Sequence, residues 1–308
     1  MPAEGLVWTP KPELLTDDEL VRVIAVAVRL GVREVRFTGG EPLLRPGVVD
    51  LVRRVSALPE HPETSLTTNG IGLARTAQAL VAAGLTRVNV SLDTLDPTRF
   101  QQLTRRDRLA DVLAGLAAAT AAGLTPVKVN AVLIRGVNDH EAPQLLEFCL
   151  DQGYQLRIIE QMPLDAQHGW DRETMVTAAE TLLKLSAAYD LVPVDARFRG
   201  SAPAEDYVVN GGGPDGSWRV GIIASVTQPF CAACDRLRLT ADGQVRNCLF
   251  SATESDLRAS LRSGLPDEQI DQQVERVLTG EVARKRAGHG IGEPDFQQPD
   301  RPMSAIGG

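Results

Sequence analysis

The chain has 308 residues, of which 43% are apolar and 23% are charged, a composition that is ordinary for a soluble globular protein. Its longest apolar stretch, Val23–Val28, is too short to span a bilayer, and Met1–Glu4 shows no feature of a signal peptide, so we expect a cytoplasmic protein without a membrane partner. The net charge of −8 disfavours general nucleic-acid binding, but one phosphorylated small molecule would need only a few local cations.

Strands and helices alternate through the first half of the chain. Segments rich in β-branched residues and bounded by turn residues predict strands, and segments with apolar residues at helical spacing predict the helices between them. The predicted strands are 32–38, 64–68, 87–92, 126–134 and 155–161, and the predicted helices are 18–30, 47–58, 73–83, 109–122 and 142–152. This alternation predicts an α/β fold with a parallel sheet, either doubly wound or curled into a βα barrel.

Each predicted strand is apolar along its length and becomes polar at its carboxyl end. The polar ends are Thr38–Glu41, Thr67–Gly70, Ser91–Asp93, Lys128–Asn130 and Glu160–Met162. In a barrel these ends line one mouth, whereas a doubly wound sheet concentrates its site at one switch point. Five polar ends in succession favour the barrel. No strand precedes the first helix, so the predicted barrel lacks its first strand and leaves an exposed edge.

The regular alternation stops at Pro163. Proline and glycine then punctuate short predicted strands at 207–210, 218–223 and 244–247, and a helical stretch follows at 254–263 and 267–278. We interpret this half as a smaller, irregular region packed against the barrel mouth. The predicted domains are therefore a barrel at residues 1–165 and a C-terminal region at residues 166–308.

Three of the four cysteines fall within 18 residues. Cys231 and Cys234 form a C-x2-C turn, and Cys248 follows after thirteen residues that include a predicted hairpin. In a cytosolic protein this spacing indicates a metal site rather than a disulfide framework. Three thiolates with one open position suit a 4Fe–4S cluster with one free iron, or a catalytic zinc. A structural zinc completed by Asp235 or His289 is the alternative.

Four cations stand in predicted strands. Arg236 and Arg238 alternate with leucines and so lie on one strand face, where guanidinium groups can bind phosphate; a solvated face is the alternative. Arg36 and Lys128 lie in apolar strands and must either reach the mouth or be paired. The turn Gly39–Glu41 lets the backbone approach a ligand, and its glutamate can accept from an amine, although a simple tight turn has the same sequence.

Taken together, these motifs resemble the molybdenum cofactor biosynthesis protein A family of GTP 3′,8-cyclases, within the radical S-adenosylmethionine superfamily. The resemblance covers essentially the whole chain, and its specific parts are the cysteine–arginine segment and the Gly-Gly terminus. The matching segments are 35–43, 66–70, 89–93, 128–130, 157–162, 230–239, 248–250 and 306–308.

The resemblance implies a partial (βα)6 barrel of the radical S-adenosylmethionine kind, two 4Fe–4S clusters, a homodimer, and a partner enzyme for the next molybdopterin step. It implies that a deoxyadenosyl radical takes the 3′ hydrogen of GTP and that the C3′ radical attacks C8 of guanine. The implied residues are Gly40, Ser91 and Met162 for S-adenosylmethionine; Arg36, Thr67, Lys128, Arg236 and Arg238 for GTP; Cys231, Cys234 and Cys248 for the second cluster; and Gly307 and Gly308 for a catalytic tail, where a flexible terminus is the alternative.

The sequence departs from the family at its start. The family has a C-x3-C-x2-C motif immediately before a Met-Pro-x-Glu stretch, which Met1–Glu4 matches. The N-terminal cluster is therefore expected in the full-length protein only, and the chain as written is expected to make no radical. Two alternatives stay open: another radical S-adenosylmethionine enzyme such as a peptide maturase, and a non-catalytic paralogue that binds nucleotide or metal.

Overall fold

An eight-stranded sheet dominates the computed structural model, which describes residues 9–211, 218–293 and 296–307. Its strand order is β1-β2-β3-β4-β5-β8-β7-β6. Neighbouring strands from β1 to β8 pair in parallel, whereas β7 and β6 are antiparallel additions at one edge. The strands are β1 (Glu34–Phe37), β2 (Glu63–Thr68), β3 (Arg87–Ser91), β4 (Val127–Val132), β5 (Gln155–Ile159), β6 (Leu191–Pro193), β7 (Glu205–Val209) and β8 (Arg219–Ile223).

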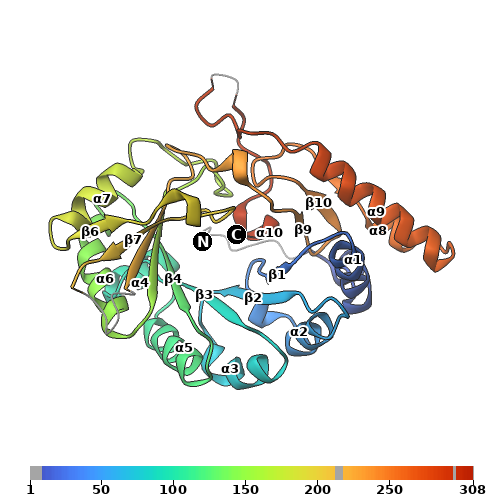
Figure 1. Cartoon of the computed structure of the whole chain (residues 1–308), viewed down its shortest axis with the longest axis horizontal. Coiled ribbons are helices and arrows are strands. Elements are labelled where there is room, and N and C mark those ends of the chain that lie inside the picture. Colours follow the sequence, from blue (N-terminus) through green and yellow to red (C-terminus); the bar gives the residue numbers. More distant parts are fainter. Residues whose placement is uncertain (1–8, 212–217, 294–295, 308) are drawn as a thin grey trace.

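The helices that follow these strands cover one face of the sheet. Figure 1 shows the strands curving in an arc, with α2, α3, α5 and α6 on its outer side. The helices are α1 (Asp17–Arg29), α2 (Val48–Ser56), α3 (Leu73–Ala82), α4 (Pro97–Thr104), α5 (Leu109–Ala121), α6 (Ala142–Asp151) and α7 (Ala178–Ser186). Short 3-10 helices occur at η1 (Lys11–Glu13), η2 (Pro42–Leu44), η3 (Asp139–Glu141), η4 (Ala196–Phe198) and η5 (Cys231–Ala233). The predicted parallel sheet, its five strands and their five helices are confirmed.

The main core lies between the sheet and the outer helices. Every second strand residue points toward the helices, and most of these residues are apolar and buried, as Leu66, Val88 and Leu156 show. They pack against helix residues such as Leu116 and Leu146. Burial of each large apolar side chain stabilises the fold by about 1.5–3 kcal/mol, so the outer face of the arc is determined by this alternation.

The sheet runs through the predicted boundary at residue 165. β8 pairs with β5 in parallel, and β7 and β6 extend the same sheet, so these strands of the second half are not a separate irregular region. The expected helix over 254–263 is confirmed only for one turn at 258–261, because a short strand, β11, pairs with β10 just before it. The helices α4 and α7 were not predicted. The remaining elements are β9 (Arg238–Leu239), β10 (Gln244–Arg246), β11 (Ser255–Asp256), α8 (Arg258–Leu261), α9 (Asp267–Ala283) and α10 (Met303–Ile306).

A second, smaller core joins the C-terminal elements to α1. Val23 and Val26 of α1 pack against Val274 and Leu278 of α9 and against Val245 of β10. The three-stranded sheet β11-β10-β9 is thereby fixed to α1 and α9. Across the described ranges no helix is both long and apolar enough to cross a membrane.

Candidate functional site

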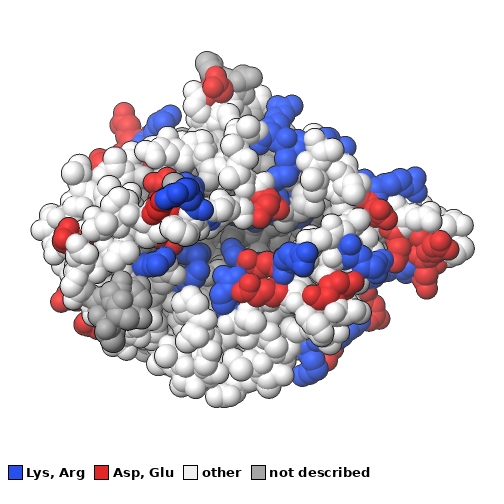
Figure 2. All heavy atoms as spheres, viewed as in Figure 1, with Lys and Arg blue, Asp and Glu red and all other residues white. Residues whose placement is uncertain are grey.

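The inner face of the arc is polar from one strand to the next. Arg36 on β1 is in register with Ser65 on β2, and Asn89 on β3 is in register with Lys128 on β4. Arg157 on β5 lies two residues beyond the strand partner of Lys128. Residues in register on parallel strands point to the same side, so these side chains share the face that the helices leave uncovered. Figure 2 shows a hollow at this place, with Lys and Arg side chains around it.

Cations crowd one another over this face. Burial, together with the charges of Arg157 and Arg87, lowers the pKa of Lys128 to about 8. Burial likewise lowers the pKa of Arg157 to about 10, with a further contribution from Arg36. Burial and the neighbouring Arg236 lower the pKa of Arg238 to about 10. Each of these groups pays an electrostatic cost for being charged here, and a bound anion would remove that cost.

In the described ranges, carboxylate ion pairs reach only the outer part of this cation cluster, although the charge of Asp206 also acts on Lys128 and Arg157. Glu34 accepts from Arg36 at 2.7 Å and lies 3.1 Å from Arg87. Within the described ranges Lys128, Arg157, Arg236 and Arg238 form no ion pair with a carboxylate, and the buried Nε of Arg157 has no hydrogen-bond partner. A buried donor without a partner costs about 1–3 kcal/mol, so this nitrogen is suited to a ligand acceptor.

Arg236 and Arg238 reach the cation cluster from the C-terminal half of the chain. Arg236 donates to the carbonyl oxygen of Ser201 at 3.2 Å, and its guanidinium lies 4.8 Å from the centroid of the Phe230 ring. Arg238 donates to the carbonyl oxygen of Gly307 at 2.7 Å. The structure therefore brings both predicted arginines together with Arg36, Lys128 and Arg157, which the sequence separates by about eighty residues or more.

The C-terminal tail docks inside the arc (Figure 1). Met303 donates its N–H to the carbonyl oxygen of Leu164 at 2.9 Å, and Gly307 is buried. Gly307 has φ +85°, and a β-carbon there would lie 2.8 Å from Cγ2 of Thr38, so only glycine fits without displacement. Gly308 lies outside the described residues. Through Gly307 the tail touches both the end of β1 and Arg238.

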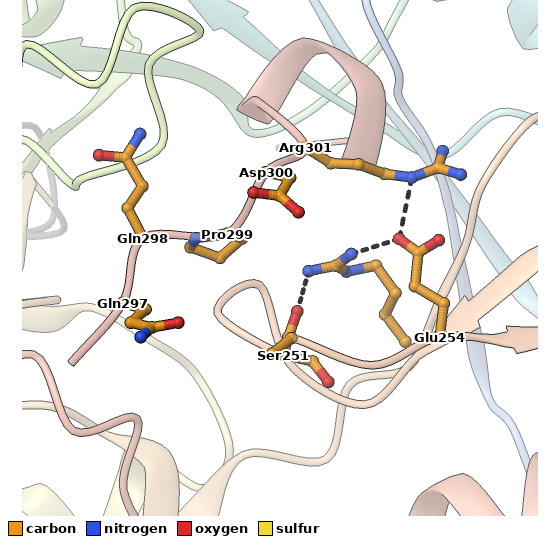
Figure 3. A pocket seen from close by; sticks show the side chains of 9 residues that line it. Ser251, Glu254, Gln297, Gln298, Pro299, Asp300 and Arg301 are labelled. Carbon is orange, nitrogen blue, oxygen red and sulfur yellow. Dashed lines mark hydrogen bonds and ion pairs between the residues drawn. The ribbon is translucent and has the colours of Figure 1, made fainter. Parts of the chain in front are cut away.

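Arg301 ties this tail to the β9–β10 hairpin. Its guanidinium donates to the Asp242 carboxylate at 3.0 and 2.7 Å and lies 3.0 Å from Glu254, which Arg246 also pairs. Figure 3 shows Arg301 and Glu254 paired beside a cavity of about 380 Å³. The hairpin begins with Arg238, so the same contacts that hold the tail also hold this arginine.

We expect Arg301→Ala to loosen the tail without unfolding the sheet. Losing charge-assisted hydrogen bonds worth about 1.5–3 kcal/mol should speed amide hydrogen exchange at residues 303–307 roughly ten-fold or more. Hydrogen-exchange mass spectrometry measures this change directly. Arg262→Ala, which removes an ion pair with Glu19 elsewhere, is the matched control. Equal exchange at 303–307 in the two variants would show that Arg301 does not anchor the tail.

The three predicted metal ligands interact electrostatically. Burial raises the pKa of Cys231, and the neighbouring Cys248 and Cys234 raise it further, which places the three thiols in electrostatic reach of one another. Over the described ranges, however, no group of three or more His, Cys, Asp or Glu side chains could hold a metal ion. The assignment of all three cysteines as ligands therefore stays a prediction.

His289 is not free to complete a zinc site. Its Nε2 lies 2.8 Å from the carbonyl oxygen of Ser225, and its Nδ1 accepts from the N–H of Ile291 at 3.2 Å. These contacts assign the proton to Nε2 and occupy both ring nitrogens. Burial lowers the pKa of His289, consistent with a neutral ring. The zinc alternative would therefore depend on Asp235, which is exposed.

The residues predicted for S-adenosylmethionine lie at one edge of the sheet. Gly40 follows β1, Ser91 ends β3 and Met162 follows β5, so all three stand at carboxyl ends of parallel strands. Glu41, expected to accept from a ligand amine, has a different role. Its carboxylate accepts from the Thr68 hydroxyl at 2.7 Å and from backbone N–H groups of neighbouring turns, and so braces the loop after β1.

Sequence reasoning missed Arg87, Asn89 and Arg157 as members of this face. Asn89 donates to the predicted Thr67 at 3.1 Å, and Arg87 and Arg157 both act on the pKa of Lys128. The signal was present as polar residues two apart within otherwise apolar strands, which places them on one face. These residues lie within the strands and not at their polar carboxyl ends.

Comparison with known proteins gives consistent matches to both halves of the chain. The Radical SAM superfamily model matches residues 4–149, and the Molybdenum Cofactor Synthesis C model matches residues 154–291. A GTP 3′,8-cyclase of Streptomyces coelicolor is 63% identical, over 100% of this chain and 88% of that protein. A GTP 3′,8-cyclase of Mycobacterium sp. (strain KMS) is 59% identical, over 100% of this chain and 86% of that protein.

Two solved structures resemble the chain more distantly. A radical SAM methyltransferase from Sphaerobacter thermophilus is 18% identical with a TM-score of 0.45, and the match covers 56% of this chain and 55% of that one. Coproporphyrinogen III oxidase from Escherichia coli is 14% identical with a TM-score of 0.43, and the match covers 61% of this chain and 46% of that one.

Proposed function

Because the chain belongs to the family of GTP 3′,8-cyclases, which are radical S-adenosylmethionine enzymes, we propose that it converts GTP to 3′,8-cyclo-7,8-dihydroguanosine triphosphate in molybdenum cofactor biosynthesis. Beyond the family, one observation supports this substrate: four cations without carboxylate partners in the described ranges converge on the inner face of a protein whose net charge is −8. A triphosphate would supply negatively charged partners for these four groups.

The finer architecture is part of the proposal. We propose a partial (βα)6 barrel whose concave side holds the substrate, with residues 166–308 forming the iron–sulfur and GTP-binding region. The curved sheet with helices on its outer side and the polar residues on its inner side support this arrangement. A cytoplasmic homodimer that passes its product to the enzyme of the next molybdopterin step completes the proposal.

The triphosphate would bind between the two halves of the chain. Arg236 and Arg238 would reach it from the β9 side, and Lys128 and Arg157 from the sheet. Each of these groups is partly or fully withdrawn from water, which strengthens its attraction for phosphate oxygen. Arg36 and Thr67 lie along the same face and would complete the contacts to the nucleotide.

The electrostatic surroundings of the cysteines support a thiolate-bound cluster. The thiols interact with one another, and Cys248 and Cys234 interact favourably with the charge of Arg238. Neighbouring cations stabilise thiolates, which are the ligand form of cysteine. Cys231, Cys234 and Cys248 would hold a 4Fe–4S cluster with one iron free for the guanine.

Gly40, Ser91 and Met162 would contact S-adenosylmethionine at the carboxyl edge of the sheet. When bound with an N-terminal cluster, S-adenosylmethionine supplies the radical that takes the 3′ hydrogen of GTP. The tail residues Gly307 and Gly308 would act beside the reacting sugar. The carbonyl oxygen of Gly307 accepts from Arg238 at 2.7 Å, and this contact would orient the guanidinium toward the nucleotide.

Anaerobic reconstitution tests the proposal. We expect the purified chain to take up iron and sulfide at the three cysteines, to bind GTP, and to show a changed electron paramagnetic resonance spectrum of the reduced cluster when GTP is added. Metal analysis that found zinc, or spectra that GTP left unchanged, would contradict the proposed site. S-adenosylmethionine cleavage measured on the same samples reports separately on radical formation.

A further inference from the structure

Lys285, two residues beyond α9, places its ammonium among the cysteine-bearing segments. Its Nζ donates to the carbonyl oxygen of Arg236 at 2.8 Å and to that of Asn247 at 2.7 Å. The same nitrogen lies 3.7 Å from the Sγ of Cys234, within hydrogen-bond range of a sulfur acceptor. An ammonium has three donors and no acceptor, so these three contacts use its full capacity.

These contacts join two segments that are separate in the sequence. Arg236 comes two residues after Cys234, and Asn247 comes immediately before Cys248. One ammonium therefore binds the backbone next to both ligand-bearing segments. Hydrogen bonds from a charged donor contribute about 1.5–3 kcal/mol each, which is enough to fix how the two segments approach.

The helix that precedes Lys285 is itself firmly placed. Ile270, Val274 and Leu278 of α9 are buried in the smaller core with α1 and β10. The side chain is only partly exposed, so water competes weakly for its donors. The ammonium also brings a positive charge to the sulfur of Cys234, which favours the thiolate and the more negative, reduced state of a bound cluster.

We propose that Lys285 is a positioning residue for the three-cysteine site, holding the Cys248 segment against the Cys231–Cys234 turn and donating its third hydrogen to Cys234. This inference rests on the proposed cluster. It assigns two measurable effects to one side chain: retention of the cluster, through geometry, and its reduction potential, through charge.

The test compares Lys285→Met and Lys285→Gln with wild type after anaerobic reconstitution, with Arg286→Met as a control because Arg286 is the exposed neighbouring cation. Loss of a partner outside the ligand shell typically weakens metal binding about 10- to 100-fold, so we expect Lys285→Met to lose iron to a chelator at least ten-fold faster. Glutamine keeps neutral N–H donors, so Lys285→Gln should retain iron better than Lys285→Met.

Redox titration followed by electron paramagnetic resonance supplies the second readout. Both variants should have a more negative reduction potential than wild type, because both lose the charge that stabilises the reduced cluster. A role confined to folding would not move the potential of the Lys285→Gln cluster. If Lys285→Met does not fold, as judged by circular dichroism, Lys285→Gln decides the question alone.

The outcomes separate this inference from the proposed function. If wild-type protein holds no cluster, the proposed function fails. If wild type holds a cluster and the Lys285→Gln cluster matches it in chelator resistance and potential, Lys285 has no positioning role while the proposed function stands. Equal changes in the Arg286→Met control would also overturn the inference, because they would show a general effect of surface charge.

Discussion

The double variant Arg236→Ala and Arg238→Ala is expected to bind GTP about 1,000-fold more weakly than wild type while keeping its iron. Each charged hydrogen-bonding group contributes about 1.5–3 kcal/mol to such a contact, and two together correspond to roughly three decades of affinity. The reason lies in the unliganded protein, where burial lowers the pKa of both guanidinium groups and the two charges oppose one another. Their electrostatic cost is recovered only when an anion binds.

The fold should tolerate the replacement of both arginines by alanine. In the described ranges neither arginine has a carboxylate partner that its removal would leave buried and unpaired. Equilibrium dialysis with GTP under anaerobic conditions measures the affinity, and a colorimetric assay measures the iron. Arg22→Ala is the matched control, because Arg22 is fully paired with Asp267 and Asp271 on the outer surface. Nucleotide affinity equal to wild type would remove the phosphate-binding role.

Local patterns in the sequence predict the helices and strands of the first half well. The structure has α1 at Asp17–Arg29, begun by a capping box in which Thr16 and Glu19 exchange hydrogen bonds, and such signals are visible without tertiary information. The same holds for the parallel strands, whose buried residues alternate with polar ones. Short-range chemistry is sufficient for these elements because each one carries its own start, stop and apolar face.

Pairing between strands that are distant in the sequence cannot be predicted from local patterns. β8 joins the sheet beside β5 although about sixty residues separate them, and nothing in the local sequence of Arg219–Ile223 selects that partner. The strand β11 was mistaken for helix because its pairing with β10 provides the stabilisation that the segment lacks alone. Long-range contacts of this kind determine which polar side chains finally meet.

In the candidate site, too, some residues can be predicted from local patterns, whereas others are identified only by long-range strand pairing. Arg236, Arg238, Arg36 and Lys128 could be predicted as a group from their unusual positions, and the structure brings them together. Arg157 was passed over because its neighbours, Leu156 and Ile158, make the segment look like a wholly buried strand. Its importance appears only once the register of β4, β5 and β8 places it beside Lys128. Gly308 and Met1–Glu4, for which the sequence also gives predictions, lie outside the described residues.

Lys128 gives the second large effect, a loss of GTP affinity with rising pH. The pKa of Lys128 is lowered to about 8, first by burial and then by Arg157 and Arg87, with a nearby Asp206 opposing the shift. A bound triphosphate would restore the pKa toward its usual range, so binding above pH 8 must take up a proton. GTP affinity should therefore be nearly constant below pH 8 and fall about ten-fold per unit above it.

The stability of the unliganded protein should change in the opposite direction. The folded-state pKa of Lys128 lies below the unfolded value of 10.5, so the folded chain binds fewer protons than the unfolded chain between pH 8 and 10.5. The contribution of this group to the free energy of unfolding is therefore unfavourable below pH 8 and is relieved as pH rises through that window. As pH rises above 8, GTP affinity should therefore fall while the contribution of Lys128 to the free energy of unfolding becomes more favourable. A general alkaline loss of structure would lower both affinity and stability.

Lys128→Met and Lys128→Arg isolate the titrating group. At pH 7 the methionine variant should bind GTP roughly 10- to 100-fold more weakly, because it lacks one charged donor. Its GTP affinity should also lose the part of the decrease between pH 8 and 9 that is due to deprotonation of Lys128. The arginine variant keeps its charge over this range, so its affinity should also lose that component while staying near wild type at pH 7. Calorimetry in two buffers of different ionisation enthalpy measures proton uptake directly. Uptake at pH 8.5 that is equal in all three proteins would show that Lys128 does not titrate on binding.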